Sequence, residues 1–186
     1  MNFLTCDIPG LIVIEPRVFE DSRGYFYEAY NEAVFAANGI PQRFVQDNQS
    51  RSSYGVIRGL HYQLNPHAQS KLVRVVEGSI LDVAVDIRKG SPTYGQHFDI
   101  VLSAENKKQL FIPAGFAHGF SVLSEVAVLF YKCDHLYNKG SEGGVRFDDP
   151  ALNIDWQVDP ARAIISERDA SMPLLRDVDH NFIFEG

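Results

Sequence analysis

Two short motifs restrict what this chain can fold into. In the first, five residues separate Gly55 from His61, and six separate Lys71 from Gly78. The second motif is Pro113-Ala114-Gly115-Phe116-Ala117-His118. Turn-forming glycines beside short runs rich in β-branched residues are typical of antiparallel strands. The motifs therefore predict neighbouring strands that carry polar groups.

This spacing resembles the two-motif pattern of cupin barrels, in which three histidines and a glutamate hold a metal ion. Here His61 and His118 keep two of the four positions, whereas Gln63 and Lys71 occupy the other two. A protonated lysine repels a divalent cation, and metal sites need neutral imidazoles, carboxylates or thiolates. The resemblance implies a cupin scaffold converted to chemistry without a metal.

The rest of the chain predicts many short strands separated by turns. Apolar or alternating runs occupy residues 11–14, 71–76, 79–88, 97–102, 109–112 and 126–131. In the run 71–76 we expect Leu72 and Val76 to face the core, since apolar and larger residues alternate there. We predict a mainly β fold, a cupin-type antiparallel β-sandwich or jelly-roll barrel.

A few short helices complete the prediction. Residues 31–39 suggest a helix with Asn31 as N-cap, and Ser166 with Asp169 three residues later is typical of a helix start. No repeat or linker composition divides the chain, so we expect residues 1–186 to form a single domain.

Composition excludes several classes of protein. Seventeen basic and 24 acidic residues give a net charge of −7, which argues against nucleic-acid binding. Two cysteines are too few for a disulfide framework and favour the reducing cytoplasm. The N-terminus lacks the basic start of a signal peptide, and no apolar run approaches the roughly 20 residues of a membrane helix.

Further motifs resemble the dTDP-4-dehydrorhamnose 3,5-epimerases of deoxysugar biosynthesis and cover nearly the whole chain. They include Asp21-Ser22-Arg23-Gly24, Gln46-Asp47-Asn48, Arg58 to Gln63, Val85 to Arg88, Ile112 to Phe120, Glu142-Gly143 and Ser166 to Asp169. The resemblance implies a cofactor-free enzyme that inverts C3 and C5 of dTDP-4-dehydro-6-deoxy-D-glucose. It also implies a homodimer.

The resemblance assigns four catalytic roles. His61 is the base, and Asp169 orients its ring and stabilises the imidazolium. Tyr131 is the acid on the opposite face of the sugar. Lys71 faces the enolate oxygen, where its ammonium supplies the positive charge that a cupin metal otherwise would.

The same resemblance assigns a substrate-binding set. Arg23 and Arg58 match diphosphate ligands, since a guanidinium fits phosphate oxygens. The other members are Phe26, Glu28, Gln46, Asp47 and Asn48 near the thymidine, with Lys71, His118, Glu142 and Arg168 near the sugar or nucleotide. The N-terminal members Arg23, Phe26 and Glu28 are expected to complete the neighbour's site.

Other readings remain open on residue types alone. His61 by itself equally suits a histidine satisfied within a core, Tyr131 a packing contact, and Arg23 a solvated turn. The chain could also be a mono-epimerase, a 3,4-ketoisomerase on a related dTDP-sugar, a metal-dependent cupin, or a sugar-nucleotide binding module without catalysis.

Overall fold

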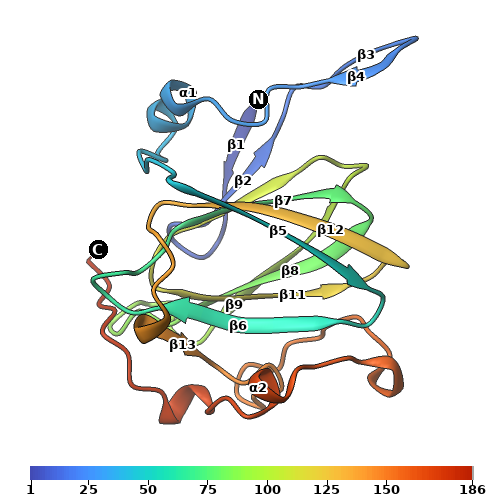
Figure 1. Ribbon diagram of the computed structural model, residues 1–186. Coiled ribbons are helices and arrows are strands. Elements are labelled where there is room, and N and C mark those ends of the chain that lie inside the picture. The colour runs from blue at the N-terminus through green and yellow to red at the C-terminus, as the bar shows by residue number, and fades with distance from the viewer. Residues whose placement is uncertain (186) are drawn as a thin grey trace.

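Two antiparallel sheets face each other in the computed structural model, which describes residues 1–185 (Figure 1). The six-stranded sheet has the order β1 (Asn2–Thr5), β2 (Ile12–Glu15), β10 (Gln109–Ile112), β7 (Lys71–Glu77), β12 (Val126–Cys133) and β5 (Gln46–Ser53). The five-stranded sheet has the order β13 (Glu142–Gly144), β6 (Ile57–Gln63), β11 (Phe116–Val122), β8 (Ser79–Asp86) and β9 (His97–Ser103). The prediction of a mainly β, antiparallel sandwich is confirmed.

The main core lies between the two sheets. Val73, Val75 and Leu129 of the six-stranded sheet are buried in the same cluster as Ile80 and Ala84 of the five-stranded sheet. Alternate residues of a strand point to opposite faces, so one face of each sheet supplies this cluster.

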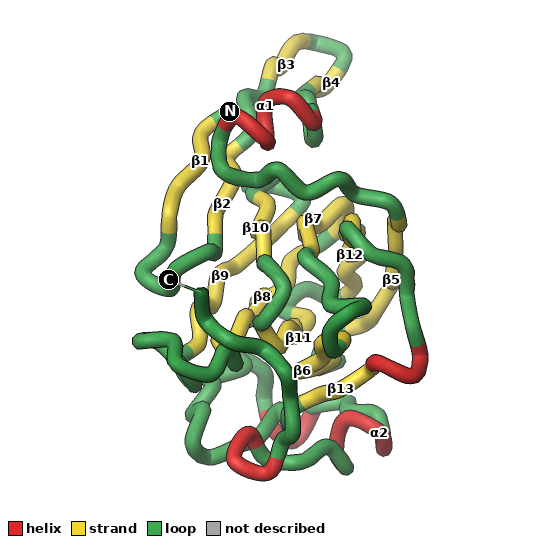
Figure 2. The backbone as a smooth tube through the Cα atoms, turned by 90° about the vertical axis from the view of Figure 1, so that its left-hand side faces the viewer, coloured by secondary structure: helices red, strands yellow, loops and turns green. Residues whose placement is uncertain are grey.

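A second core covers the outer face of the five-stranded sheet. Leu81, Val83 and Val85 of β8 pack there with Trp156 and Phe182 from the C-terminal third of the chain. The C-terminal segment runs beneath this sheet in Figure 1 and crosses the end of the barrel in Figure 2. Because β8 is buried on both faces, apolar residues occupy five of its eight positions and include neighbours that point to opposite faces, such as Ile80 and Leu81.

One expected core position is wrong. Val76 is 41% exposed, and the strand buries Val73 and Val75 between the sheets instead. Leu72 is buried on the opposite face, where it packs with Phe35 of α1 (Glu32–Ala37). The helix covers only the start of β7, which explains why Leu72 is covered and Val76 is not.

The predicted helix starts are confirmed. The side chain of Asn31 accepts a hydrogen bond from the Val34 amide at the start of α1, and Ser166 caps α2 (Glu167–Ala170) in the same way. Single 3₁₀ turns occupy Lys139–Ser141, Pro160–Arg162 and Leu175–Asp177.

A two-stranded hairpin, β3 (Phe19–Asp21) and β4 (Gly24–Phe26), projects away from the sandwich (Figure 1). Its turn falls at the predicted Asp-Ser-Arg-Gly sequence, and every residue of both strands is exposed. Among residues 1–185, no helix is long and apolar enough to cross a membrane.

Candidate active site

A cavity of about 270 Å³ opens between the two sheets. Its walls come from β5, β6, β7, β11 and β12. The lining residues are Asn48, Gln49, Ser50, Arg58, His61, Lys71, His118, Gly119, Phe120, Leu129 and Tyr131. Six of the predicted site residues therefore meet in one cavity, although they come from distant parts of the sequence.

His61 and Asp169 form a hydrogen-bonded pair on one wall. His61 Nε2 lies 2.9 Å from Asp169 Oδ1, and the Gly59 amide donates to Asp169 Oδ2 at 3.1 Å. The His61 side chain is 37% exposed and that of Asp169 only 7%. Burial alone would raise the pKa of Asp169, but hydrogen bonds from His61, Gly59 and Ser166 hold it below its usual value.

Local structure positions this carboxylate. Ser166 caps α2 by accepting a hydrogen bond from the Asp169 amide at 3.1 Å, so Asp169 lies in the first turn of the helix. An acidic residue is favoured there because the backbone N–H groups of a first turn are unpaired. The Ser166 cap thus fixes the position of Asp169, which in turn orients the His61 ring.

Two glycines let β6 and β11 approach closely beside the pair. Gly59 has a φ of +136°, and a Cβ on it would lie 2.6 Å from the Gly119 Cα. A Cβ on Gly119 would in turn lie 2.7 Å from the Arg58 carbonyl oxygen. Only glycine fits both requirements at Gly59, and this backbone supplies one of the donors to Asp169.

The facing sheet contributes Lys71 and Tyr131. Lys71 opens β7 and pairs with Cys133 of β12, two residues beyond Tyr131. Burial lowers the pKa of the Lys71 ammonium, although the charge of Asp82 opposes the shift. Burial also raises the pKa of Tyr131, which keeps its phenol protonated at neutral pH.

A second imidazole–carboxylate pair lies deeper between the sheets. His118 Nε2 is 3.0 Å from Asp82 Oδ2 and 3.1 Å from Oδ1, and Asp82 is fully buried. Burial lowers the pKa of His118, against the opposing effect of Asp82. Our sequence prediction missed Asp82 as a site residue. The available signal was a carboxylate at an inward position of an otherwise apolar strand.

The residues at the cupin metal positions do not fit a divalent cation. His61 and His118 are each bonded to a carboxylate, and Lys71 occupies a third position. The Gln63 side chain donates to the His67 carbonyl at 2.7 Å and accepts from the Asn138 amide at 2.7 Å. Within residues 1–185, no group of three or more His, Cys, Asp or Glu side chains could hold a metal.

The predicted nucleotide-binding residues of β5 separate by face. Gln46 Nε2 donates to Asn48 Oδ1 at 3.0 Å, so these two side chains lie together as the alternation predicted. Asp47 points to the other face, where Lys132 Nζ lies 2.9 Å from its carboxylate. The structure therefore does not bring Asp47 into the cavity of its own chain.

Three other members of the predicted set are ordered by local contacts. Arg58 Nε donates to the buried Ser52 hydroxyl at 3.2 Å, a partner that the sequence did not reveal. Arg168, next to Asp169, forms an ion pair with Glu142 at 2.8 Å. Glu142 starts β13, which pairs with the His61 strand, so this ion pair joins α2 to the sheet beside the dyad.

The hairpin residues lie outside this cavity. Arg23 and Phe26 line a separate hollow of the projecting hairpin, and their exposed fractions are 88% for the Arg23 side chain and 70% for Phe26. Glu28 is also exposed and accepts a hydrogen bond from Asn31 at 3.3 Å. The structure of one chain does not bring these three residues to His61.

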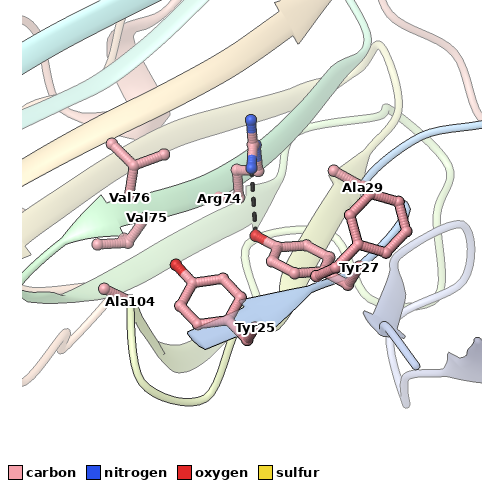
Figure 3. Close-up of a pocket in the computed structure, with 8 residues that line it drawn as sticks. Tyr25, Tyr27, Ala29, Arg74, Val75, Val76 and Ala104 are labelled. Atoms are coloured by element: carbon pink, nitrogen blue, oxygen red, sulfur yellow. Dashed lines mark hydrogen bonds between the residues drawn. The ribbon is translucent and has the colours of Figure 1, made fainter. Parts of the chain in front are cut away.

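Figure 3 shows a groove at the base of the hairpin, on the outer face of the six-stranded sheet. Tyr25 and Tyr27 stack there with ring centroids 6.0 Å apart, and Arg74 Nη1 donates to the Tyr27 hydroxyl at 3.2 Å. The groove has a cavity volume of about 350 Å³. It contains none of the acid–base residues of the other cavity.

Fold and cavity together define the class of cupin-type isomerases, in which acid–base side chains face each other across a barrel. Residues 5–177 match the model of the family described as dTDP-4-dehydrorhamnose 3,5-epimerase. The enzyme of that name from Shigella flexneri is 50% identical over 181 residues, covering 97% of this chain and 99% of the relative. The Pseudomonas aeruginosa enzyme is 52% identical, covering 92% of this chain and 94% of the relative.

Solved structures agree. The dTDP-4-dehydrorhamnose 3,5-epimerase of Elizabethkingia anophelis superposes with a TM-score of 0.91 at 53% identity, covering 95% of this chain and 97% of that one. The Legionella pneumophila enzyme, in complex with dTDP-4-keto-L-rhamnose, gives 0.92 at 48% identity, covering 96% and 94%. The chain belongs to the dTDP-4-dehydrorhamnose 3,5-epimerase family, as its motifs predicted.

Proposed function

We propose that this protein inverts C3 and C5 of dTDP-4-dehydro-6-deoxy-D-glucose to give dTDP-4-dehydro-L-rhamnose. The observation that carries the proposal is the His61–Asp169 pair on one wall of a cavity that Tyr131 and Lys71 line from the other. The complex of the Legionella relative with dTDP-4-keto-L-rhamnose supports the substrate class. At each carbon one proton is removed and another is added on the opposite face, with no change of oxidation state, so the reaction needs no cofactor.

The hydrogen bonds of His61 assign its two nitrogens. Nε2 faces Asp169, which accepts its proton, so Nδ1 is the nitrogen left to act as base. In the proposed step Nδ1 takes the proton from C3 or C5, and the electrons of the broken C–H bond move toward the C4 oxygen. The Asp169 carboxylate then stabilises the imidazolium.

Lys71 and Tyr131 complete the step. The Lys71 ammonium stabilises the enolate oxygen at C4, in a low-dielectric site where a positive charge is most effective. The Tyr131 phenol then delivers a proton to the opposite face of the same carbon. Burial raises the pKa of Tyr131, so its proton is retained until the strongly basic enolate forms.

The nucleotide occupies the other end of the proposed site. Arg58, held by Ser52, binds the diphosphate, and Gln46 with Asn48 binds the thymidine. His118, Glu142 and Arg168 lie near the sugar or nucleotide. We retain Asp47 only as a residue that could act from the outer face, because it pairs with Lys132.

We further propose a homodimer in which the hairpin of each chain completes the partner's site. Arg23 and Phe26 are exposed at a distance from their own cavity, and the groove at the hairpin base exposes Tyr25 to solvent. A pair of chains related by a two-fold axis would bury both hairpins reciprocally. Arg23, Phe26 and Glu28 would then bind the nucleotide of the neighbouring chain.

Mixed dimers test the exchange of hairpins. His61→Ala and the double variant Arg23→Ala/Phe26→Ala are each expected to be inactive. Unfolded and refolded together, they form mixed dimers in which the His61→Ala chain donates an intact hairpin to an intact cavity. About a quarter of wild-type activity should return, since half of the dimers are mixed and each has one complete site. No recovery in a verified mixed dimer would show that each hairpin serves its own chain.

We place this activity in one domain, residues 1–186, in the cytoplasm. The dyad joins β6, in the first half of the chain, to α2 near its C-terminal end, which supports a single folding unit. Cys6 and Cys133 are both free thiols, which supports a reducing compartment.

Proton NMR in D₂O tests the function itself. Metal-stripped protein is mixed with dTDP-4-dehydro-6-deoxy-D-glucose, and deuterium is followed at C3 and C5. Incorporation at both carbons, lost in His61→Ala, is the expected result. No exchange at either carbon, with activity restored by an added metal, would overturn the proposal.

The same spectrum tests a second candidate, a mono-epimerase. This chain is 32% identical to ChmJ, a 3′-monoepimerase from Streptomyces bikiniensis, and superposes on its complex with dTDP-quinovose with a TM-score of 0.85. Deuterium at C3 alone would favour that activity. We favour the double epimerase because relatives of that name are about 50% identical.

A further inference from the structure

The last residues of the chain form a segment that the family model does not include. The model match ends at residue 177, and residues 178–185 follow, which we call the C-terminal clasp. The clasp is bonded to the end of the five-stranded sheet. Lys89 N donates to the Phe182 carbonyl, Phe184 N donates to the Lys89 carbonyl, both at 3.0 Å, and Lys89 Nζ donates to the His180 carbonyl at 2.7 Å.

The clasp also holds the loop that joins the two catalytic strands. Residues 64–70 connect β6, which carries His61, to β7, which begins at Lys71. The Asn65 amide donates to Asn181 Oδ1 at 3.1 Å, Asn65 Nδ2 donates to the Asn181 carbonyl at 3.4 Å, and Asn181 Nδ2 donates to the Asn65 carbonyl at 3.1 Å. These three bonds join the clasp to the start of the loop, two residues after β6 ends.

The rest of this loop has anchors of another kind. At its centre, the His67 carbonyl accepts a hydrogen bond from Gln63 at 2.7 Å. Near β7, the Ser70 amide donates to Asp134 at 2.7 Å, and the Ser70 hydroxyl accepts from the Ala114 amide at 3.3 Å. The three hydrogen bonds of Asn65 within the described residues all go to the clasp, so the position of the loop where it leaves β6 depends on the clasp.

We propose that the C-terminal clasp positions the β6–β7 loop, and through it the spacing of His61 and Lys71, and that protonation of His180 releases the clasp. The effect on catalysis rests on the proposed function, whereas the effect on the loop does not. Asn181 and His180 are positioning residues, because neither touches the cavity.

His180 is suited to this role by its surroundings. It is 3% exposed, its Nδ1 has no hydrogen-bond partner among the described residues, and its Nε2 lies 3.5 Å from the Tyr94 hydroxyl. Its ring stacks on Phe182 with centroids 5.9 Å apart. A proton on Nδ1 would leave a buried charge without a partner.

The charged and titratable groups around His180 set the direction of the response. Burial and the ammonium of Lys89 lower its pKa, while Asp179 opposes them; the nearby phenols of Tyr62 and Tyr94 stay neutral at these pH values. The released segment binds a proton more readily than the docked one. Docking is therefore complete above about pH 6.5 and weakens as the pH falls below it.

Hydrogen–deuterium exchange measures the loop without reference to activity. In Asn181→Ala, peptides covering residues 64–70 should exchange about tenfold faster at pH 7.5, because the two hydrogen bonds between the Asn181 side chain and the Asn65 backbone are lost. Asn106→Ala is the matched control, since the Asn106 side chain also forms hydrogen bonds with backbone groups, in the turn between β9 and β10. It should leave residues 64–70 unchanged. Equal exchange in wild type and Asn181→Ala would overturn the proposal.

The pH response separates His180 from the other histidines near the loop, His67 and His135. Between pH 7.5 and 5.5, after correction for intrinsic rates, wild-type exchange at residues 64–70 should accelerate. His180→Phe, which keeps the stacking, should abolish this acceleration. His180→Gln serves if the phenylalanine variant does not fold. Acceleration that persists in the folded variant would overturn the role of His180.

Steady-state kinetics complete the test. In Asn181→Ala, kcat should fall about tenfold while dTDP affinity is unchanged, because Asn48 lies on β5 and Arg58 is held by Ser52 of β5 at the end of β6 away from the loop. An altered loop with unchanged kcat would overturn the catalytic half of the proposal. If the wild-type protein shows no epimerase activity, the result would instead count against the proposed function.

Discussion

Asp169 combines burial with an ordered set of donors. Its two carboxylate oxygens accept hydrogen bonds from His61 and Gly59. In asparagine an NH₂ group replaces one of these oxygens, so one of the two N–H donors would face another donor. The carboxamide also carries no charge to stabilise an imidazolium. Asp169→Asn therefore keeps the volume of the side chain but removes both the acceptor and the charge on which His61 depends.

We predict that Asp169→Asn lowers kcat by roughly 10²–10⁴-fold, the usual contribution of a positioned acid–base group. Affinity for dTDP, measured by calorimetry, should remain unchanged, since Gln46, Asn48 and Arg58, the residues proposed to bind the thymidine and diphosphate, lie on β5 and β6 and not on α2. Asp155→Asn, in an exposed loop, is the control and should retain full activity. A kcat within a few-fold of wild type would contradict the assigned role.

At the level of elements, β6 and β11 depend on two glycines for their close approach. Gly59→Ala would force a methyl group against Gly119 and strain a φ of +136°. We predict a loss of about 3 kcal/mol or more in the free energy of unfolding, measured by urea denaturation. Gly90→Ala is the control, because its φ is +84° but a Cβ there meets nothing within 4 Å.

The expected loss for Gly90→Ala is about 1 kcal/mol, from backbone strain alone. The difference between the two variants then measures the steric contact of β6 with β11. Equal losses would show that strain rather than contact dominates at Gly59. A shifted His61 should also lower activity in Gly59→Ala, whereas Gly90→Ala should remain active.

The helices and strands were predictable where neighbouring residues in the sequence determine them. The caps at Asn31 and Ser166 identified both α-helices, and alternation identified most strands. The exposure of Val76 was not predictable, because it depends on whether another element covers that face of β7. The ion pair of Asp47 with Lys132 was not predictable either, since a motif match does not state which face of β5 a residue occupies, and the role of Asp47 in substrate binding stays a prediction.

Across the whole molecule, the family and the cluster of His61, Lys71, His118 and Tyr131 in one cavity could be predicted from motifs. The motifs could not reveal Ser52, which acts through Arg58 and has no spacing signature, whereas an inward carboxylate on β8 was the available signal for Asp82. The roles of Arg23, Phe26 and Glu28 stay a prediction, because they depend on a second copy of the chain.

The buried His118–Asp82 pair links the stability of the whole molecule to pH. The pKa of His118 is lowered by folding, so the unfolded chain binds its proton more readily and stability falls as the pH drops below about 6.5. We predict that His118→Gln, which still donates to Asp82, makes this fall shallower by up to about 1.4 kcal/mol per pH unit. Urea denaturation at pH 7.5, 6.5 and 5.5 measures both slopes. Parallel slopes would contradict the prediction.

The separation of 108 positions between His61 and Asp169 also determines when the site can form. Strands β5 to β12 contain Arg58, His61, Lys71 and Tyr131, and they are synthesised before α2 emerges. A growing chain therefore assembles the cavity first and acquires the carboxylate that orients its base only when the C-terminal third docks on β6. Contacts of such long range close late in folding. Activity should thus appear during synthesis as a single late event, after nearly the whole polypeptide has been made.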